Sequence, residues 1–276
     1  MSNPKPFLLL LAIAAMLAPC AARAVEIIGH RGASHDAPEN TLAAFRLAWE
    51  QGADAAEVDI WLSKDQRIVA LHDKTTKRTT GTDWMIADRP LAELKTLDAG
   101  RWKGERFAGE RLPVLEEVLE VVPPGKRLFI EIKCSAEVLP HLERVLAESG
   151  KSPRQVVLIA FDFDVITAAK KRMPRVKAYW LYGTTPKVDK ETGKVSDRPE
   201  ELLARCRAAG LDGLDLKYDS ALGSEFIQQL RAAGLGLYVW TVNEPEVAIR
   251  LARLGVDGIT TDRPGWLREQ LAAGGK

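Results

Sequence analysis

Four short motifs carry the residue types that perform acid–base and metal chemistry, and each stands where an apolar run ends. They are His30-Arg31, Glu57-Val58-Asp59, His72-Asp73 and Glu131-Ile132-Lys133. Side chains alternate along a β-strand, so residues two positions apart point to the same side. Glu57 is therefore expected to point with Asp59, and Glu131 with Lys133.

The carboxylates of Glu57, Asp59 and Glu131 predict a site for one divalent cation. Like charges held so close are costly unless a cation or a proton lies between them. Ca²⁺ and Mg²⁺ both prefer carboxylate oxygens, and either would satisfy such a cluster. The alternative for Glu131 is a plain ion pair with Lys133 that fills the interior of the fold.

Arg31 and Lys133 add positive charge beside the predicted cation site and so indicate an anionic substrate. Arginine holds a phosphate through two parallel N–H bonds. His30 and His72 could then move protons on opposite sides of a phosphorus atom, because histidine titrates near neutral pH. These residues together predict metal-dependent hydrolysis of a phosphate diester.

The elements that must bring these motifs together are strands and helices in alternation. Strands are predicted at residues 26–30, 55–60, 128–133, 156–160, 177–181, 213–216, 236–241 and 257–261. Helical patterns follow at residues 41–51, 114–122, 136–148, 164–172, 199–209, 220–233, 244–254 and 264–273. Eight such units favour a closed TIM-type (β/α)8 barrel, whose active sites lie at the carboxyl ends of the strands. An open doubly wound sheet is the alternative, but no Gly-x-Gly-x-x-Gly loop follows a strand.

One further strand-like run, residues 66–71, interrupts the alternation. It lies too close to residue 60 for a parallel crossover, which needs about a dozen residues or more. We therefore expect an antiparallel hairpin that turns at Lys64-Asp65-Gln66 and returns His72 to the barrel mouth. Residues 62–112 would form an insertion, with a loop at 74–83 and a short helix at 91–97. Residues 183–197 are a second polar excursion.

The N-terminus predicts secretion. An apolar run at residues 7–17 follows Lys5, and Ala22-Arg23-Ala24 fits a signal-peptide cleavage site. Cleavage near Ala24 would leave a catalytic domain of residues 25–276, in the bacterial periplasm and without a stable membrane anchor. A transmembrane anchor would need about 20 apolar residues. Lipid attachment at Cys20 is a second alternative, which the directly preceding proline disfavours.

Composition and charge restrict the possible partners. The chain has 276 residues, of which 46% are apolar, enough for the core of one large domain. Residues 1–24 hold two basic residues and no acid, so their removal changes the formal charge from +1 to −1. Nothing in this charge favours nucleic acid or anionic membranes, and a small-molecule substrate is expected. The oligomeric state stays open. Cys134 at a strand end and Cys206 in an outer helix are expected to be free thiols.

Six motifs in order resemble the glycerophosphodiester phosphodiesterases. They are HRGASHDAPENT from His30, EVDI, LHD ending at Asp73, EIK, WTVN from Trp240 and DGITTD ending at Asp262. The likeness runs from His30 to about Pro264. It implies a TIM-type barrel that hydrolyses glycerophosphodiesters to glycerol 3-phosphate and an alcohol. The chain departs from the family at the hairpin, where Asp65-Gln66 replaces Asp-Gly, and at Ala160-Phe161, where Ser-Phe is common.

The resemblance also implies roles for individual residues. His30 and His72 match the general acid/base pair, and Arg31 and Lys133 match the phosphate-binding residues. The metal ligands correspond to Glu57, Asp59 and Glu131. Glu39 matches a position near the metal or near a histidine, and the insertion would help to bind the glycerol moiety. Trp240 would line the same pocket or would be an apolar residue of the barrel mouth.

Three other functions are compatible with parts of the sequence. A phospholipase D that acts on lysophospholipids would keep the same site and add an apolar entrance. Trp84, Met85, Ile86 and Trp102 could form that entrance or could pack under the insertion. A secreted protein that binds phosphodiesters without cleaving them is disfavoured by the two intact histidines. A glycosidase would not need three clustered acids together with an arginine and a lysine.

Overall fold

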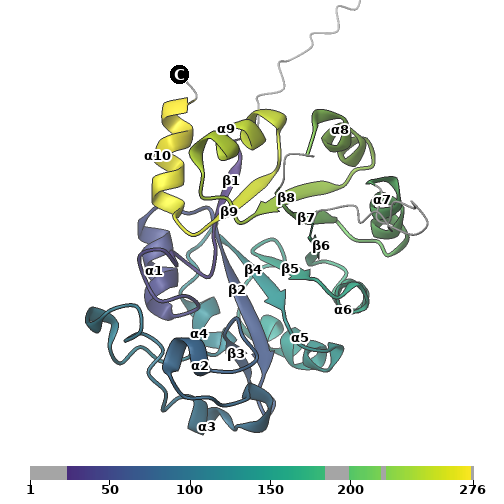
Figure 1. Ribbon diagram of the computed structural model, residues 1–276. Helices are drawn as coiled ribbons and strands as arrows, with labels where there is room; N and C mark the ends of the chain where they lie inside the picture. The colour runs from purple at the N-terminus through teal and green to yellow at the C-terminus, as the bar shows by residue number, and fades with distance from the viewer. Residues whose placement is uncertain (1–23, 184–198, 219–221, 275–276) are drawn as a thin grey trace, which may run out of the picture.

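The structure is a computed structural model that describes residues 24–183, 199–218 and 222–274 (Figure 1). The predicted signal peptide, apart from Ala24, lies outside the described residues. So do Cys20 and the predicted polar excursion beyond Gly183. Among the described residues, no helix combines the length and the apolar character that crossing a membrane requires.

Eight parallel strands close into a barrel, as the alternation predicted. They are β1 (Glu26–Gly29), β2 (Ala55–Leu62), β4 (Arg127–Ile132), β5 (Val156–Ala160), β6 (Lys177–Tyr182), β7 (Gly213–Lys217), β8 (Gly236–Trp240) and β9 (Gly258–Thr261). Each strand pairs with its neighbours in the order β1-β9-β8-β7-β6-β5-β4-β2. The pairing of β1 with β2, in which Ile28 lies opposite Ala55, closes the ring. The TIM-type barrel is therefore confirmed.

Helices surround the barrel (Figure 1). They are α1 (Leu42–Glu50), α4 (Leu115–Glu120), α5 (Leu139–Glu148), α6 (Phe163–Arg172), α7 (Pro199–Ala208), α8 (Ser224–Ala232), α9 (Pro245–Leu254) and α10 (Pro264–Gly274). Local signals set their ends: Thr41 Oγ1 accepts a hydrogen bond from the Ala44 N–H, and Asp162 caps α6 in the same way. The predicted helix at 136–148 is divided, because a 3-10 turn η3 (Ala136–Val138) precedes α5.

Two apolar layers fill the fold. The larger one lies between the barrel strands and the helices. The smaller one fills the barrel interior and consists of Ile28, Ala55, Phe129, Val157, Ile159, Tyr179, Leu181 and Tyr238. The Tyr238 ring contacts Phe129 and Tyr179 edge to face, with centroids 5.0 and 4.9 Å apart. This packed interior forms a floor beneath the barrel mouth.

The extra strand β3 (Ile68–Ala70) runs antiparallel to β2, with Ile60 opposite Ala70 and Leu62 opposite Ile68. The predicted hairpin is thus confirmed. Gln66 in its turn has a φ of 61°, a left-handed conformation that glycine adopts more easily. Gln66 thus adopts this conformation at the turn position where glycine was expected from the resemblance.

The insertion has an apolar cluster of its own. It consists of Val69, Leu71, Ile86, Leu94, Leu97, Ala99 and Leu112. Around it lie α2 (Lys77–Thr80), η1 (Ile86–Asp88), α3 (Leu91–Leu94) and η2 (Glu105–Phe107). The prediction of a loop at 74–83 was wrong for α2, a single turn too short to show helical periodicity. The predicted helix at 91–97 ends at Leu94.

Candidate active site

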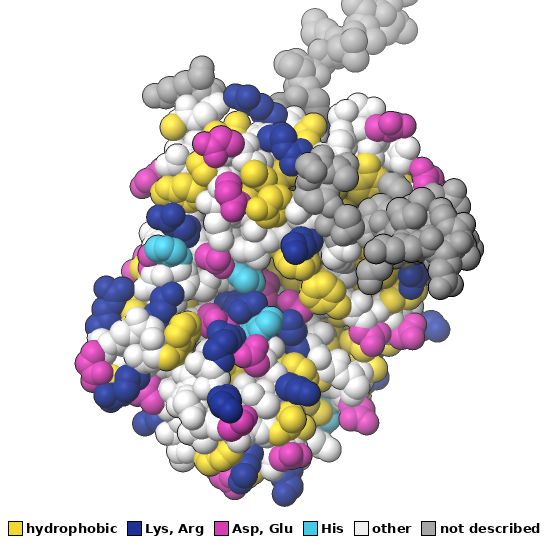
Figure 2. All heavy atoms as spheres, viewed as in Figure 1, with side chains coloured by type: hydrophobic (Ala, Val, Ile, Leu, Met, Phe, Trp, Pro, Cys, Tyr) yellow, Lys and Arg dark blue, Asp and Glu magenta, His cyan; other side chains and the backbone are white. Residues whose placement is uncertain are grey.

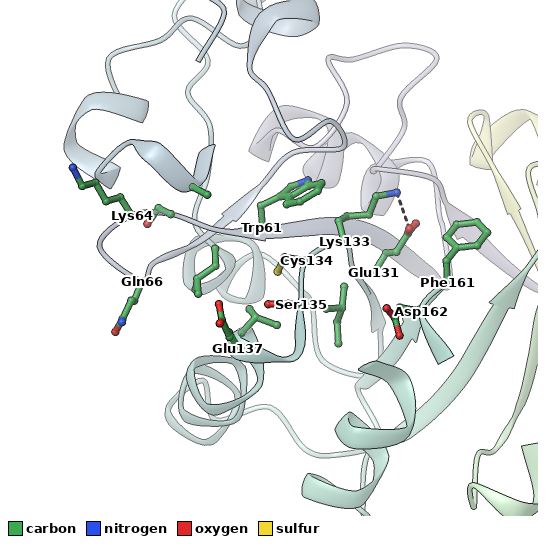
Figure 3. A pocket seen from close by; sticks show the side chains of 15 residues that line it. Trp61, Lys64, Gln66, Glu131, Lys133, Cys134, Ser135, Glu137, Phe161 and Asp162 are labelled. Atoms are coloured by element: carbon green, nitrogen blue, oxygen red, sulfur yellow. Dashed lines mark hydrogen bonds and ion pairs between the residues drawn. The ribbon is translucent and has the colours of Figure 1, made fainter. Parts of the chain in front are cut away.

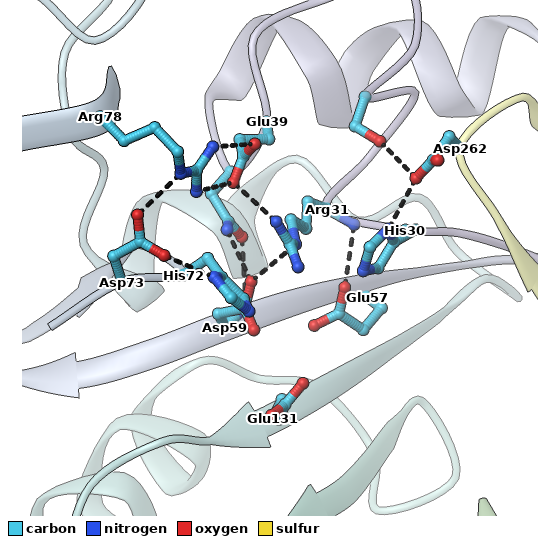
Figure 4. A network of polar contacts seen from close by, with 12 residues as sticks. His30, Arg31, Glu39, Glu57, Asp59, His72, Asp73, Arg78, Glu131 and Asp262 are labelled. Atoms are coloured by element: carbon cyan, nitrogen blue, oxygen red, sulfur yellow. Dashed lines mark hydrogen bonds and ion pairs between the residues drawn. The ribbon is translucent and has the colours of Figure 1, made fainter. Parts of the chain in front are cut away.

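The four predicted motifs meet at the carboxyl ends of β1, β2 and β4 (Figure 4). His30 follows β1, Glu57 and Asp59 belong to β2, and the hairpin brings His72 to the same place. A cavity of about 180 Å³ opens there. Its lining consists of His30, Arg31, Glu57, His72, Glu131, Lys133, Ile159, Phe161, Leu181, Asp215, Trp240, Thr241 and Thr260. On this face histidines lie among basic and acidic side chains, beside hydrophobic ones (Figure 2).

The three predicted cation ligands form one cluster. Glu57, Asp59 and Glu131 each present an oxygen within 4.8 Å of the other two. Glu57 and Asp59 are buried, and Glu57 Oε1 and Asp59 Oδ1 have no hydrogen-bond partner within the described chain. Burial, Asp59 and Glu131 raise the pKa of Glu57 well above its usual range, and burial and Asp59 raise the pKa of Glu131 to about 7. Buried, repelling carboxylates with uncommitted oxygens fit a divalent cation.

The loop after β1 fixes the direction of two of these carboxylates. The backbone N–H of Arg31 donates to Glu57 Oε2 at 2.9 Å. Asn40 Nδ2 donates to Asp59 Oδ2 at 2.8 Å, and Asn40 Oδ1 accepts from the Asp59 N–H at 3.2 Å. Arg31 and Asn40 have φ values of 55° and 57°, so the loop is held in a left-handed conformation at both positions. Sequence reasoning missed Asn40, although it lies inside the quoted HRGASHDAPENT motif.

Arg31 and Lys133 remain charged beside the acids. Arg31 Nε lies 3.1 Å from Asp59 Oδ2, and Lys133 Nζ lies 2.7 Å from Glu131 Oε1. Burial opposes the charge of both side chains, but the neighbouring carboxylates outweigh burial and raise both pKa values. The ion pair that was the alternative for Glu131 is therefore present, and both of its members also line the cavity.

Each histidine is oriented by an aspartate. His30 Nδ1 lies 2.6 Å from Asp262 Oδ1, and Asp262 accepts further bonds from Asn243 Nδ2 at 2.7 Å and Ser34 Oγ at 3.0 Å. Burial would raise the pKa of Asp262, but the hydrogen bond from His30 and its other donors lower it, so this aspartate stays ionised. The quoted DGITTD and WTVN motifs contain Asp262 and Asn243, but the sequence assigned neither a role.

His72 repeats this arrangement across the cavity. Its Nδ1 lies 2.7 Å from Asp73 Oδ1, and Arg78 Nε donates to Asp73 Oδ2 at 2.7 Å. Both histidines thus use Nδ1 for an aspartate, which leaves Nε2 available to the cavity that both rings line. Burial lowers the pKa of His72, and the charges of Arg31 and Lys133 act in the same direction.

Glu39 contacts two arginine side chains, Arg31 and Arg78, and makes no hydrogen bond to the acid cluster. Its carboxylate accepts from Arg31 Nη1 at 2.8 Å and from Arg78 Nη1 and Nη2 at 2.7 and 2.8 Å. Because Arg78 also holds Asp73, Glu39 links Arg31 to the aspartate that orients His72 (Figure 4). Through Arg31, Glu39 is also connected to Asp59, so both roles implied for this position stay predictions.

Two aromatic rings border the mouth. Trp240 lines the cavity and contacts Phe161 edge to face at 5.5 Å between centroids, and its Nε1 donates to the backbone oxygen of Asp215 at 3.1 Å. Phe161 is 47% exposed. Glu131, Lys133 and Phe161 also line a second, larger cavity of about 810 Å³. Its remaining wall includes Trp61, Lys64, Gln66, Glu137 and Asp162 (Figure 3).

Four apolar residues of the insertion were considered as an entrance for an acyl chain: Trp84, Met85, Ile86 and Trp102. They line neither of the two cavities. Ile86 is buried in the apolar cluster of the insertion, and Trp84 packs against that cluster. Met85 and Trp102 are partly exposed elsewhere on the insertion. Cys134 and Cys206 are free, as predicted.

Comparison with known proteins identifies the group to which this arrangement is similar. The model of the glycerophosphoryl diester phosphodiesterase family matches residues 30–266. A glycerophosphodiester phosphodiesterase of Caldanaerobacter subterraneus subsp. tengcongensis is 36% identical over 253 residues, which cover 90% of this chain and 98% of that protein. A human lysophospholipase D is 26% identical over 268 residues, 88% of this chain and 85% of that protein.

A solved structure supports the same comparison. It is that of an Oleispira antarctica phosphodiesterase in complex with the product sn-glycerol-3-phosphate. The two chains superpose with a TM-score of 0.79 and are 30% identical, and the match covers 90% of this chain and 97% of that one.

Proposed function

Because the chain belongs to the glycerophosphoryl diester phosphodiesterase family and is thereby a phosphodiesterase, we propose that it hydrolyses glycerophosphodiesters to glycerol 3-phosphate and an alcohol. One observation carries the proposed mechanism: two histidines, each oriented by an aspartate, line one cavity with a cluster of three buried carboxylates. Proton transfer and charge neutralisation are the two requirements of phosphodiester hydrolysis.

Arg31 and Lys133 bind the phosphate of the substrate in this proposal. Both line the cavity, and both keep their charge because acidic neighbours surround them. Glu57, Asp59 and Glu131 would hold one Ca²⁺ or Mg²⁺ ion, which when bound supplies positive charge to the phosphoryl oxygens. A secreted setting, if the N-terminus directs export, would favour Ca²⁺.

The two histidines divide the proton transfers. His72 suits the role of base, because burial lowers its pKa and keeps Nε2 free of a proton at neutral pH. Its Nε2 takes the proton of the hydroxyl group that attacks phosphorus, which belongs either to water or to the substrate's glycerol. In the second case water then opens the cyclic phosphate that forms. His30, held at Nδ1 by the ionised Asp262, then protonates the oxygen of the leaving alcohol from Nε2. Each aspartate stabilises the positive charge that its histidine acquires during the reaction.

Removal of the cation tests the proposal. Excess chelator should abolish the release of glycerol 3-phosphate from glycerophosphocholine, and added Ca²⁺ or Mg²⁺ should restore it. His30→Ala and His72→Ala should each lose activity by about 10²- to 10⁴-fold while the protein stays folded. Full activity in excess chelator, or in the double histidine variant, would overturn this mechanism.

A phospholipase D activity towards lysophospholipids is the alternative on the same scaffold. It is named for the human relative, but the residues considered for an acyl-chain entrance line neither described cavity, namely Trp84, Met85, Ile86 and Trp102. Comparing the kcat/KM values for glycerophosphocholine and lysophosphatidylcholine separates the two activities. A protein that binds phosphodiesters without cleaving them would hydrolyse neither glycerophosphocholine nor lysophosphatidylcholine.

The cellular location of the protein is also part of the proposal. Residues 1–24 would direct export, and residues 25–276, with an insertion at about 62–112, would form the catalytic domain in the periplasm. Fractionation of the producing cell, with sequencing of the mature N-terminus, tests this. A mature chain that begins near Val25 is the expected result, and an uncleaved cytoplasmic chain would contradict it.

A further inference from the structure

One buried acid at the mouth of the barrel has no part in the proposed chemistry. Asp215 lies in β7, is 2% exposed and lines the cavity of about 180 Å³. Its Oδ1 has no hydrogen-bond partner within the described residues. Buried polar groups without partners are rare in native proteins, and a binding role is a common reason for them.

No described cation accompanies Asp215. Within the described residues its side chain forms no ion pair, and Glu131 is the charged neighbour that affects its pKa. Burial raises the pKa of Asp215 well above its usual range, with a further contribution from Glu131. A protonated carboxyl group can both donate and accept a hydrogen bond, which suits a neutral polar partner such as a hydroxyl group.

The surroundings of Asp215 divide the cavity into two parts. Arg31, Lys133 and the acid cluster form the charged part. The other part includes Leu181 and Trp240, the lining residues that lie next to Asp215. Leu181 lies directly opposite Asp215 in the sheet, and the Trp240 indole donates to the Asp215 backbone. A group that extends from a bound phosphate into this part would meet apolar walls and one carboxyl group.

The two cavities differ in size, about 180 against 810 Å³, and the two halves of a glycerophosphodiester differ in size as well. The glycerol half is constant and small, with two hydroxyl groups on three carbons, whereas the alcohol half varies. The smaller cavity ends on the packed barrel interior, to which its lining residues Ile159 and Leu181 belong. The larger cavity adjoins it at Glu131, Lys133 and Phe161 and extends between the hairpin and the loop after β4 (Figure 3).

From this division we propose that Asp215 forms a hydrogen bond with a glycerol hydroxyl and so selects substrates whose glycerol end is not acylated. The inference rests on the proposed function and adds a specificity-determining residue to it. The glycerol half then lies in the smaller cavity and the alcohol half in the larger one. The hairpin turn of the insertion, which supplies Lys64 and Gln66 to the larger cavity, contacts the alcohol, while His72 of the same insertion lines the smaller cavity.

Two matched ligands test this without any chemical step. Glycerol 3-phosphate and n-propyl phosphate share the phosphate and the three carbons and differ in the two hydroxyl groups. Their dissociation constants would be measured by calorimetry, with Ca²⁺ or Mg²⁺ at saturation, for the wild-type protein and for Asp215→Leu, Asp215→Ala and Asp215→Asn. Asp212→Asn is the control, because Asp212 lies near the start of β7 in ion pairs with Lys170 and Lys177.

The wild-type protein should bind glycerol 3-phosphate at least about tenfold more tightly than n-propyl phosphate. Asp215→Leu and Asp215→Ala should remove this preference and leave the affinity for n-propyl phosphate within about threefold. Asp215→Asn, which can still hydrogen-bond, should keep most of the preference, and Asp212→Asn all of it.

Equal affinity of the wild-type protein for the two ligands would overturn the inference, even if the Asp215 variants fail to fold. Equal weakening of both ligands in Asp215→Ala would also overturn it. The proposed function is tested separately, by measuring hydrolysis of glycerophosphocholine by the wild-type protein. Hydrolysis without a preference for glycerol 3-phosphate refutes the role of Asp215 alone, and the absence of hydrolysis refutes the function.

Discussion

His30 Nδ1 lies 2.6 Å from Asp262 Oδ1, although the two residues are separated by 232 positions in the chain. His30 follows the first barrel strand and Asp262 follows the last, and these two strands are neighbours because the barrel is closed. Closure of the barrel therefore brings His30 and Asp262, one of the two histidine–aspartate pairs, together. Without it, the histidine would have no group to fix its tautomer.

Asp262→Asn should lower kcat for glycerophosphocholine by about 10²- to 10⁴-fold with little change in KM. The asparagine keeps the shape of the side chain, but it cannot stabilise a positively charged His30. Steady-state kinetics measure the effect, and Ser34→Ala, which removes one donor to Asp262 at 3.0 Å, is the matched control with a much smaller loss. A kcat within about threefold of wild type would show that Asp262 does not assist His30 in the reaction.

The pH dependence of kcat/KM should follow the protonation of His72. A base must be unprotonated to act, and burial lowers the pKa of His72 below its usual 6.5. Activity should therefore be maintained down through pH 6.5 and be lost only at a lower pH. Asp73 raises the pKa of His72 through its hydrogen bond, so Asp73→Asn should move this loss to a still lower pH. A loss that begins above pH 7, or one that moves upward in Asp73→Asn, would contradict the assignment of His72 as the base.

Glu57→Gln should affect stability in opposite directions with and without the cation. In chelator the variant should be at least as stable as the wild-type protein, because one of three repelling carboxylates is gone. Cation at about 100 times its dissociation constant should stabilise the wild-type protein by about 2.7 kcal/mol, and the variant clearly less. Thermal unfolding in chelator and in Ca²⁺ or Mg²⁺ measures both effects. An equal gain from the cation in both proteins would show that Glu57 is not a ligand.

Asp98 should contribute acid-sensitive stability to the insertion. Its carboxylate accepts from the N–H groups of Gly100, Arg101 and Gly109, and these bonds, led by that of Arg101, lower its pKa to about 2. A lowered pKa stabilises the fold above the unfolded value of about 4, and this contribution is lost as the pH falls towards 2. Because the side chain is partly exposed, Asp98→Asn should cost roughly 1 kcal/mol at pH 6.

Unfolding of wild-type protein, Asp98→Asn and the exposed control Asp88→Asn at pH 6 and pH 2.5 measures this contribution. The difference between wild type and Asp98→Asn should shrink at the lower pH, while Asp88→Asn should match the wild-type protein at both. A difference that stays constant with pH would mean that the backbone bonds do not depend on the charge of Asp98.

The sequence predicted the barrel because its signals are local or periodic. Apolar runs and amphipathic stretches each act over a few positions. The hairpin followed from chain length alone, because too few residues separate β2 from β3 for any other connection. Strand alternation then brought Glu57, Asp59 and Glu131 to one side of the sheet.

The partners of these residues could not be predicted in the same way. Asn40 meets Asp59 because the loop after β1 turns through two left-handed residues, and no short-range rule specifies that path. Arg78 belongs to a single helical turn, α2, that was read as loop. Asp215 looks like any polar residue at a strand end, and its importance depends on the depth of its burial.

The separate apolar cluster of the insertion has a consequence for the way in which activity is lost. Small elements with their own core can open as independent cooperative units, below the free energy of global unfolding. The insertion carries His72 and Asp73, whereas the barrel carries His30 and Asp262. Heating should then inactivate the enzyme before the barrel melts, with amide hydrogen exchange of β3 faster than that of β5. Thermal tolerance of catalysis and thermal stability of the barrel are thus two properties, and substitutions inside the insertion can change the first without the second.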